Sequence, residues 1–242
     1  AAAPIDKKVG KWLEDIGIIF LQGYGLTETA PISAVTPDYK TMVGSAGKTI
    51  WQADIKVDNP NENGEGELMI KSPTLMLGYY EDEEATKKAI TEDGYFHSGD
   101  IGYVDDEGYV FVTGRSKNVI VTQNGKNIYP EEIEMLLDKV PEIKESMVYG
   151  KTPEGEIAKK KDQKELIITA RCIPNIEEIE KLHGKDLTED QIHDIIWEKI
   201  KEVNKKLTSY KAIKSLEIKT GEFEKTSTMK IKRYKELQNK TK

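Results

Sequence analysis

The spacing of apolar residues divides the chain into a first part of short strands and a second part that mixes helices with strands. Residues 5–16 carry apolar side chains about every 3.6 positions, which predicts an amphipathic helix, and the apolar run 17–21 predicts a buried strand. Further short strands are predicted between turns, at 50–57, 66–71, 102–104 and 109–113. This spacing predicts a small β-barrel or meander.

Beyond residue 114, helical and extended patterns alternate. Residues 130–140 predict a short helix that begins at Pro130, because proline is favoured in the first helical turn. A longer predicted helix follows Thr188, its expected N-cap, with Gln191 in the capping-box position. Strands are predicted at 145–149, 166–173 and 213–218. Together these elements predict an α+β domain.

The two patterns meet in residues 114–134. A polar, Gly-led turn is followed there by an apolar run, by an Asn-Gly pair at 124–125 that is typical of hairpins, and by the helix at Pro130. An ordinary surface hairpin is the simplest interpretation of this stretch alone. Because the character of the sequence changes on either side of it, we interpret residues 115–117 as a hinge between a domain 1–114 and a domain 118–242.

Composition agrees with a two-domain protein of the cell interior. The chain has 242 residues, of which 37% are hydrophobic and 33% charged, so it is long enough for two domains. No apolar run approaches the roughly 20 residues of a membrane span, and the first residues do not resemble a signal peptide. The single cysteine, Cys172, favours a reducing compartment and a buried structural thiol. We therefore expect a soluble, cytoplasmic protein.

Charge is distributed unevenly along the chain. Residues 1–114 contain 9 Lys and Arg against 20 Asp and Glu (net −11), whereas residues 115–242 contain 27 against 23 (net +4). A basic domain beside an acidic one suits closure over a polyanion. The acidic first part argues against nucleic acid as a partner, because nucleic-acid binding usually needs a basic surface.

Three segments carry candidate chemistry. A Gly-rich loop with Thr and Glu at residues 22–29 occupies a frequent ligand-binding position, although a polar turn into a helix would also explain it. Residues 44–49 fail as a phosphate loop because Met42 stands where the Walker pattern needs its first glycine. Asp100 suits either an Asx-turn or a carboxylate that binds a ribose diol. His97 has no ligand partners at metal spacing, so we assign it no metal.

Several of these segments agree in order and spacing with known motifs. They are Tyr24–Thr29, Gly66–Leu68 with Gly78-Tyr79, Phe96–Asp100, Gly114–Glu134 and Lys225–Arg233. In this order they resemble the nucleotide loops, the hinge and the terminal catalytic-lysine motif of the adenylate-forming superfamily, which includes acyl-CoA synthetases, luciferases and adenylation domains. The resemblance extends over essentially the whole chain.

The resemblance implies catalytic roles for three residues. Lys230 would reach the carboxylate and α-phosphate oxygens during adenylation, and Thr27 would hydrogen-bond the phosphate of the adenylate. Glu28 would help to hold Mg²⁺, a hard cation that prefers carboxylate and phosphate oxygens. A solvated lysine in a Lys-rich segment is the plain alternative for Lys230.

The resemblance also implies a nucleotide site. Tyr24 would line the adenine site of ATP or AMP, with Gly25 beside it in the same loop. Asp100 would bind both ribose hydroxyls, and Arg115 would lie near the same sugar.

In this family the C-terminal domain rotates between the two half-reactions. Lys117 occupies the hinge position, where a residue must absorb a large change in backbone torsion. Gly125 would leave room for the pantetheine arm of CoA, the co-substrate of the second half-reaction.

The family's Ser/Thr/Gly-rich phosphate loop and most of its acyl tunnel have no counterpart in these residues. The resemblance therefore implies the C-terminal part of a longer enzyme, which we expect to be inactive by itself. Lys126–Ile128 and residues 226–230 are most similar to long-chain fatty acid–CoA ligases, although Met229 stands where many members have glycine. The predicted substrates are a fatty acid, ATP and CoA. An adenylation domain that loads a carrier protein and a non-catalytic nucleotide-binding or interaction module are the alternatives, and oligomeric state and peripheral membrane contact stay open.

Overall fold

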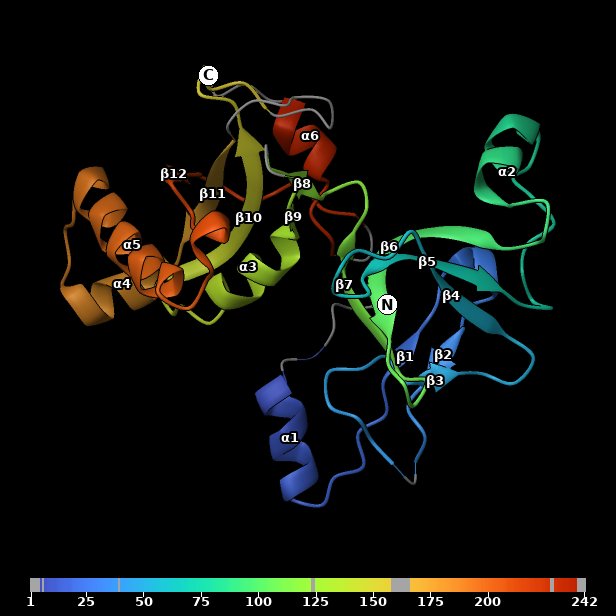
Figure 1. Ribbon diagram of the computed structural model, residues 1–242. Helices are drawn as coiled ribbons and strands as arrows, with labels where there is room; N and C mark the ends of the chain where they lie inside the picture. The colour runs from blue at the N-terminus through green and yellow to red at the C-terminus, as the bar shows by residue number, and fades with distance from the viewer. Residues whose placement is uncertain are drawn as a thin grey trace. The chain divides into compact units, whose positions relative to one another are not determined.

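The computed structural model describes residues 5, 7–38, 40–122, 125–157, 166–226 and 229–238 (Figure 1). Contacts divide the chain into two compact units, residues 1–117 and 118–242, and each unit has its own hydrophobic core. The division falls at the end of the segment 115–117 that the sequence marks as a hinge. Rotation about that segment stays a prediction.

The described residues of the first unit form two antiparallel sheets, two short helices and one 3₁₀ turn. Its elements are α1 (Lys7–Asp15), β1 (Gly23–Tyr24), η1 (Thr27–Thr29), β2 (Ala34–Val35), β3 (Lys48–Thr49), β4 (Asp54–Asp58), β5 (Gly66–Lys71), α2 (Glu83–Ala89), β6 (Phe96–Val104) and β7 (Val110–Arg115). Strands β1 to β3 form one sheet and β4 to β7 the other, each in sequence order. The rejection of a phosphate loop is confirmed, because Lys48 and Thr49 lie in β3 and not at the start of a helix.

The β4–β7 sheet confirms the predicted meander. A bridge between Lys48 and Tyr109 links β3 to the residue before β7. Among the described strands, however, no ladder joins β1 to β4, so these strands form open sheets. The barrel part of the prediction is therefore not confirmed.

The segment after α1 departs from the sequence prediction. The helix predicted at 5–16 is confirmed as α1, but the buried strand predicted at 17–21 is wrong. Ile18, Ile19 and Leu21 are 49%, 72% and 51% exposed, and the first ladder begins only at Gly23. A run of apolar residues becomes a strand only where a neighbouring strand pairs with it, and no described residue does so here.

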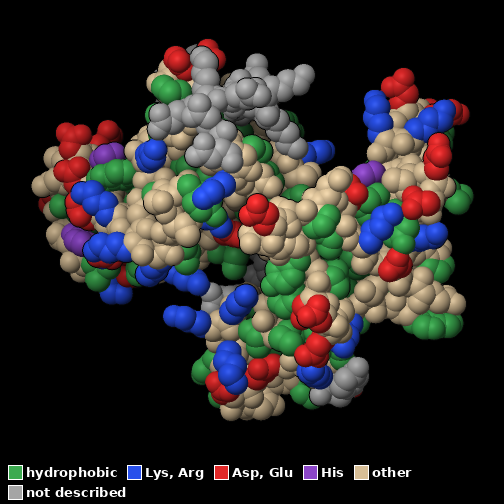
Figure 2. Space-filling model, viewed as in Figure 1, with side chains coloured by type: hydrophobic (Ala, Val, Ile, Leu, Met, Phe, Trp, Pro, Cys, Tyr) green, Lys and Arg blue, Asp and Glu red, His purple; other side chains and the backbone are tan. Residues whose placement is uncertain are grey.

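Helix α2 is absent from the sequence prediction because it has no buried face. Its N-cap, Asp82, accepts a hydrogen bond from the backbone N–H of Ala85 at 2.9 Å. Two i,i+4 ion pairs, Glu83–Lys87 and Glu84–Lys88, each span 3.6 Å along its surface. Figure 2 shows charges of both signs close together on this helix, at the upper right. The N-cap and the ion pairs therefore stabilise α2 in place of a buried apolar face.

The second unit packs helices against a three-stranded sheet. Its elements are β8 (Ile120–Val121), β9 (Asn127–Ile128), α3 (Pro130–Leu137), β10 (Ile143–Lys151), β11 (Ile167–Pro174), α4 (Ile176–His183), α5 (Glu189–Asn204), η2 (Ser209–Lys211), β12 (Ser215–Ile218) and α6 (Arg233–Gln238). The predicted α+β architecture is confirmed in this unit. The predicted helix at Pro130 is confirmed as α3, and α5 begins with the predicted capping box of Thr188 and Gln191. The sequence prediction lacks α4 and α6.

The two faces of the β10–β11–β12 sheet are covered by different parts of the chain. β10 pairs antiparallel with β11, and β11 pairs parallel with β12. One face carries Ala170 and Cys172 into the main core, together with residues from α3, α4 and α5. On the other face, Met147 and Tyr149 pack with Phe223 and other residues of the C-terminal segment. The C-terminal segment is thus a separate layer on the sheet.

Cys172 is the buried structural thiol that the sequence predicts. It is fully buried, and burial raises the pKa of its thiol to about 12, so the thiol stays protonated at neutral pH. Within the described residues, no helix has the length and apolar character needed to cross a membrane.

Candidate functional site

The loop after β1 needs glycine at position 25. A Cβ atom built at Gly25 would lie 1.6 Å from the carbonyl oxygen of Pro31, so any side chain would clash with backbone. The close approach is fixed by buried Thr29, whose hydroxyl accepts from the backbone N–H of Leu26 at 3.1 Å and from the Ser33 hydroxyl at 2.9 Å. The loop therefore folds back on itself and presents the η1 turn with Thr27 and Glu28.

We expect Gly25→Ala to lower the free energy of unfolding of the first unit by about 1–3 kcal/mol, the usual cost of overpacking. Gly23→Ala is the matched control, because a Cβ atom there would lie at an ordinary 3.7 Å from the Ala34 carbonyl oxygen. Urea unfolding followed by circular dichroism measures both variants. Equal stability of the two variants would show that the Gly25–Pro31 approach imposes no constraint.

Asp100 lies on an irregular stretch of β6. Met69 pairs with His97 and Glu67 pairs with Ile101. These pairs lie two residues apart on β5 but four residues apart on β6, so β6 holds two extra residues there. Gly99 within the stretch has a left-handed φ of +70°. Such bulges bend a strand and redirect side chains beside functional sites. Asp100 lies within this bulge, between the two paired stretches of the β5–β6 ladder.

Glu67 supports the bulge, a role that the sequence analysis did not assign. Its Oε1 accepts from the backbone N–H of Gly99 at 2.9 Å, and its Oε2 lies 3.2 Å from Nδ1 of His97. The Ser98 hydroxyl donates to the Leu68 carbonyl at 2.5 Å. Backbone groups that the bulge removes from the ladder thus gain side-chain partners. The Gly-Glu-Leu segment gave the only signal for Glu67, through its place in the family pattern.

Two of the predicted site residues, Tyr24 and Arg115, contact a third, Asp100, which is 3% exposed. The phenol of Tyr24 donates to Oδ2 of Asp100 at 2.8 Å, and Nε of Arg115 lies 2.7 Å from Oδ1. Burial, followed by the charge of Asp100, raises the pKa of Tyr24 well above its ordinary value, so this phenol is a donor at neutral pH. A carboxylate accepts hydrogen bonds at about four positions, and the Tyr24 phenol and the Arg115 guanidinium hold this one in a fixed orientation. The arrangement is a rigid, negatively charged acceptor suited to a diol.

Glu28 lies in the same unit and has a partner of its own. The phenol of Tyr79 donates to its Oε1 at 3.3 Å, and its backbone carbonyl accepts from Met76 at 2.8 Å. Within the described residues no cluster of three or more His, Cys, Asp or Glu could enclose a metal ion. Mg²⁺ commonly binds through one or two carboxylates and completes its shell with substrate phosphates and water. One half-buried carboxylate beside the exposed Thr27 hydroxyl fits that mode of binding.

Lys230 lies in the second unit, on a tight hairpin. Lys225 and Ile231 form an antiparallel bridge, and the backbone N–H of Thr226 donates to the Lys230 carbonyl at 2.8 Å. Met229 has a left-handed φ of +62° and is 71% exposed. A glycine would adopt this backbone more readily than Met229 does, since a Cβ atom disfavours positive φ. Lys230 itself is exposed and has no ion pair with a described residue.

The two remaining predicted positions lie in turns. Lys117 is exposed and is the last residue of the first unit. Gly125 has φ +73° in the turn between β8 and β9, and its backbone N–H donates to the Thr122 carbonyl at 2.9 Å. Asn124, the other half of the predicted Asn-Gly turn, lies outside the described residues. The structure brings Tyr24, Asp100 and Arg115 together, and the roles of all the predicted site residues stay predictions.

Comparisons with known proteins agree with these motifs. A model of the AMP-binding enzyme family matches residues 1–80. YdaB of Bacillus subtilis (strain 168), which is named as an acyl–CoA ligase, is 36% identical over 197 residues, or 72% of this chain and 39% of that protein. The 2-succinylbenzoate–CoA ligase of Bacillus cytotoxicus is 41% identical over 144 residues, or 57% of this chain and 30% of that protein. The chain thus spans well under half the length of these relatives.

A solved structure shares the fold. The o-succinylbenzoate CoA synthetase of Bacillus subtilis in complex with its acyl-adenylate intermediate matches with a TM-score of 0.74 and 25% identity, over 100% of this chain and 45% of that chain. The same synthetase in complex with ATP and magnesium ion matches with a TM-score of 0.74 and 24% identity, over 96% of this chain and 44% of that chain. With the motifs and the Tyr24–Asp100–Arg115 arrangement, these matches establish that the chain belongs to the AMP-binding enzymes of the adenylate-forming superfamily.

Proposed function

We propose that this chain is the C-terminal part of an ATP-dependent acid–CoA ligase. In the first half-reaction, the carboxylate oxygen of the acid would attack the α-phosphorus of ATP, giving an acyl-adenylate and pyrophosphate. In the second, the thiol of CoA would attack the acyl carbon, giving a thioester and releasing AMP. The observation that carries this proposal is the buried Asp100 carboxylate, which Tyr24 and Arg115 hold in a chain of this family.

The residues of the first unit suit the nucleotide. Asp100 would accept the ribose hydroxyls, and Arg115 would stabilise the Asp100 charge from the neighbouring strand. Thr27 and Glu28 would face the phosphates. Glu28 would help to hold Mg²⁺, which would neutralise part of the phosphate charge. Lys230, on its exposed hairpin, would stabilise the negative charge that develops at the α-phosphate and the attacking carboxylate.

Two observations bear on the identity of the acid. Lys126–Ile128 and residues 226–230 favour a long-chain fatty acid through their resemblance to that subfamily. The Bacillus cytotoxicus relative is named for 2-succinylbenzoate, an aromatic acid. Both relatives reported above are named as CoA ligases, which favours CoA over a carrier protein as the thiol acceptor.

We expect Asp100→Asn in the full-length protein that carries this chain to raise the KM for ATP about 10–100-fold, because hydrogen bonds to a charged group contribute about 1.5–3 kcal/mol. Asp106→Asn, at an exposed turn of the same unit, is the control and should leave the KM unchanged. Steady-state pyrophosphate release at varied ATP measures both. An unchanged KM in Asp100→Asn would remove the main support for the proposed nucleotide site.

A further inference from the structure

The hairpin that carries Lys230 is anchored at its base and exposed at its tip. Glu224 and Lys232 close the base through a backbone hydrogen bond of 2.7 Å, and α6 follows directly. At the tip, Met229 holds a left-handed backbone that an L side chain disfavours. Such a conformation persists only where the surrounding structure imposes it. The contacts that anchor the base therefore help to determine the position of Lys230.

Glu236, on α6, is the centre of one anchor and is 4% exposed. Its Oε1 accepts from the backbone N–H of Glu224 at 2.8 Å, which ties α6 to the start of the hairpin. Its Oε2 lies 3.2 Å from Nζ of Lys219. One buried carboxylate thus joins the segment before the hairpin to the helix after it.

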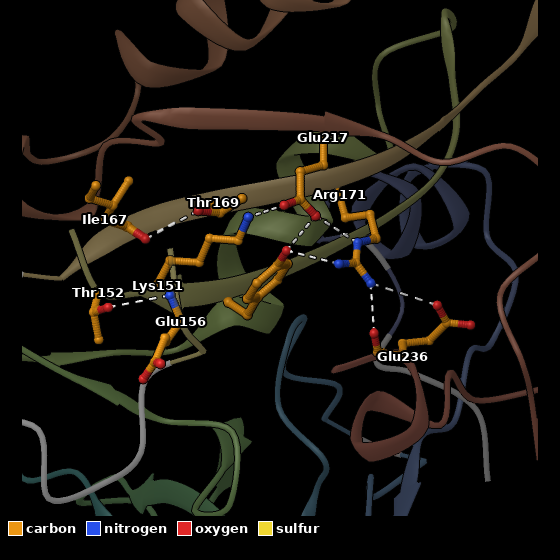
Figure 3. Close-up of polar contacts among 9 residues, drawn as sticks. Lys151, Thr152, Glu156, Ile167, Thr169, Arg171, Glu217 and Glu236 are labelled. Atoms are coloured by element: carbon orange, nitrogen blue, oxygen red, sulfur yellow. Dashed lines mark hydrogen bonds and ion pairs between the residues drawn. The ribbon is translucent and has the colours of Figure 1, made fainter. Parts of the chain in front are cut away.

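Arg171, on β11, fixes this carboxylate and the helix to the sheet. Its Nη1 donates to the Glu236 backbone carbonyl at 2.7 Å and lies 3.9 Å from Oε2 of the same residue (Figure 3). That carbonyl is among the last of α6, which have no partner within the helix. The contact therefore satisfies an orphan acceptor while it fixes α6 to the sheet.

Arg171 is itself held from the other side. Its Nε donates to Oε2 of Glu217 at 2.8 Å, and its Nη2 donates to the Tyr149 phenol at 3.1 Å. Lys151 also pairs with Glu217. Burial opposes the charge on Glu217, but the hydrogen bonds from Lys151, Tyr149 and Arg171 outweigh burial and lower the pKa of that carboxyl. Glu217 is therefore charged at neutral pH and orients the guanidinium.

We propose that Arg171 and Glu236 are positioning residues for Lys230. The chain of contacts runs from Glu217 through Arg171 to Glu236, and from Glu236 to the hairpin at Glu224. It holds the hairpin base against the face of the sheet opposite α3–α5, so that the lysine is presented at a fixed place on this unit. The inference rests on the proposed role of Lys230 in adenylation and identifies what would hold it.

The test compares the two half-reactions in the full-length protein that carries this chain. We expect Glu236→Ala to lower kcat for acid-dependent pyrophosphate release on the order of 10–100-fold, the size expected when a reacting group is misplaced by about 1 Å. The KM for ATP and thioester formation from preformed acyl-adenylate should stay within about twofold of wild type, since Lys230 acts only in the first half-reaction.

Two further variants separate positioning from loss of structure. Glu236→Gln keeps one side-chain acceptor for the Glu224 N–H and the backbone carbonyl that accepts from Arg171, but loses the charge, so its kcat should lie between those of Glu236→Ala and wild type. Glu222→Ala removes a 77% exposed carboxylate on the same segment and should have no effect. Protection of buried Cys172 from a thiol reagent reports whether the second unit is folded in each variant.

The inference is overturned if folded Glu236→Ala or Glu236→Gln adenylates at the wild-type rate, or if both half-reactions fall by the same factor. Lys230→Ala, assayed in parallel, distinguishes a failure of the proposed role of Lys230 from a failure of the positioning role of Arg171 and Glu236. If Lys230→Ala also leaves adenylation intact, the proposed function of the hairpin fails as well. If Lys230→Ala abolishes adenylation while the Glu236 variants do not change it, only the positioning role fails.

Discussion

Lys230→Ala in the full-length protein is expected to lower acyl-adenylate formation about 100-fold or more, by analogy with the loss of a group that stabilises developing negative charge. Thioester formation from preformed acyl-adenylate should be nearly unchanged, because the phosphoryl transfer is then complete. Lys230 is exposed, so a substrate can reach its ammonium group, and no described residue forms an ion pair with it. Single-turnover assays of each half-reaction measure the two effects separately.

Lys185→Ala provides the matched control, since Lys185 is an exposed lysine of the same unit outside the hairpin. It should leave both half-reactions within about twofold of wild type. A similar loss in Lys185→Ala, or an equal loss in both half-reactions for Lys230→Ala, would contradict a specific role of Lys230 in adenylation.

Arg233→Met is expected to lower the free energy of unfolding of the second unit by about 3–5 kcal/mol. Arg233 begins α6, pairs with Glu134 of α3, and donates from Nη1 to the Val148 carbonyl of β10 at 3.0 Å. Burial raises the pKa of Glu134, and only the charge of Arg233 and local hydrogen bonds oppose that rise. Removing the arginine leaves a buried carboxylate without its counter-charge, and this is the main cost.

A second substitution checks that explanation. Glu134→Gln keeps an acceptor for the backbone N–H of Val148, which donates to Glu134 at 2.6 Å, but carries no charge. Combined with Arg233→Met, it should restore roughly 1–3 kcal/mol. Lys235→Ala, at a 42% exposed side chain of the same helix, should cost less than about 1 kcal/mol.

The single cysteine makes these stability measurements specific to the second unit. Cys172 is fully buried in the core of that unit, so its labelling rate in urea reports unfolding there and not in the first unit. Arg233→Met should expose the thiol at lower urea than wild type. If the double variant is no more stable than Arg233→Met, lost packing and not the orphaned charge explains the destabilisation.

Features that depend on neighbouring residues in the chain could be predicted from the sequence. The capping box of Thr188 and Gln191 and the helix start at Pro130 are set by local backbone chemistry, and both are confirmed. The order of motifs was enough to predict the family. The short α2 and α6 were missed because neither presents an apolar stripe, and the wrong strand at 17–21 shows that apolar character does not specify a pairing partner.

The contacts that build the site join residues far apart in the sequence. Tyr24 and Asp100 are separated by 76 positions, so the motif around Tyr24 predicts a place beside adenine but not the hydrogen bond to Asp100. Glu67 meets Gly99 only because β6 holds two extra residues at that point. A single sequence contains no signal for a register irregularity of this kind. The residues of the site could therefore be predicted, but the hydrogen bonds that join them could not.

We propose that this chain belongs to an enzyme that joins a carboxylic acid to CoA through an adenylate. The most direct measurement is pyrophosphate release by the full-length protein with ATP and Mg²⁺, across a panel of fatty and aromatic acids, with CoA as acceptor. We predict release that depends on one class of acid, with one thioester and one AMP formed per pyrophosphate. ATP binding without acid-dependent pyrophosphate release from any member of the panel would contradict the account.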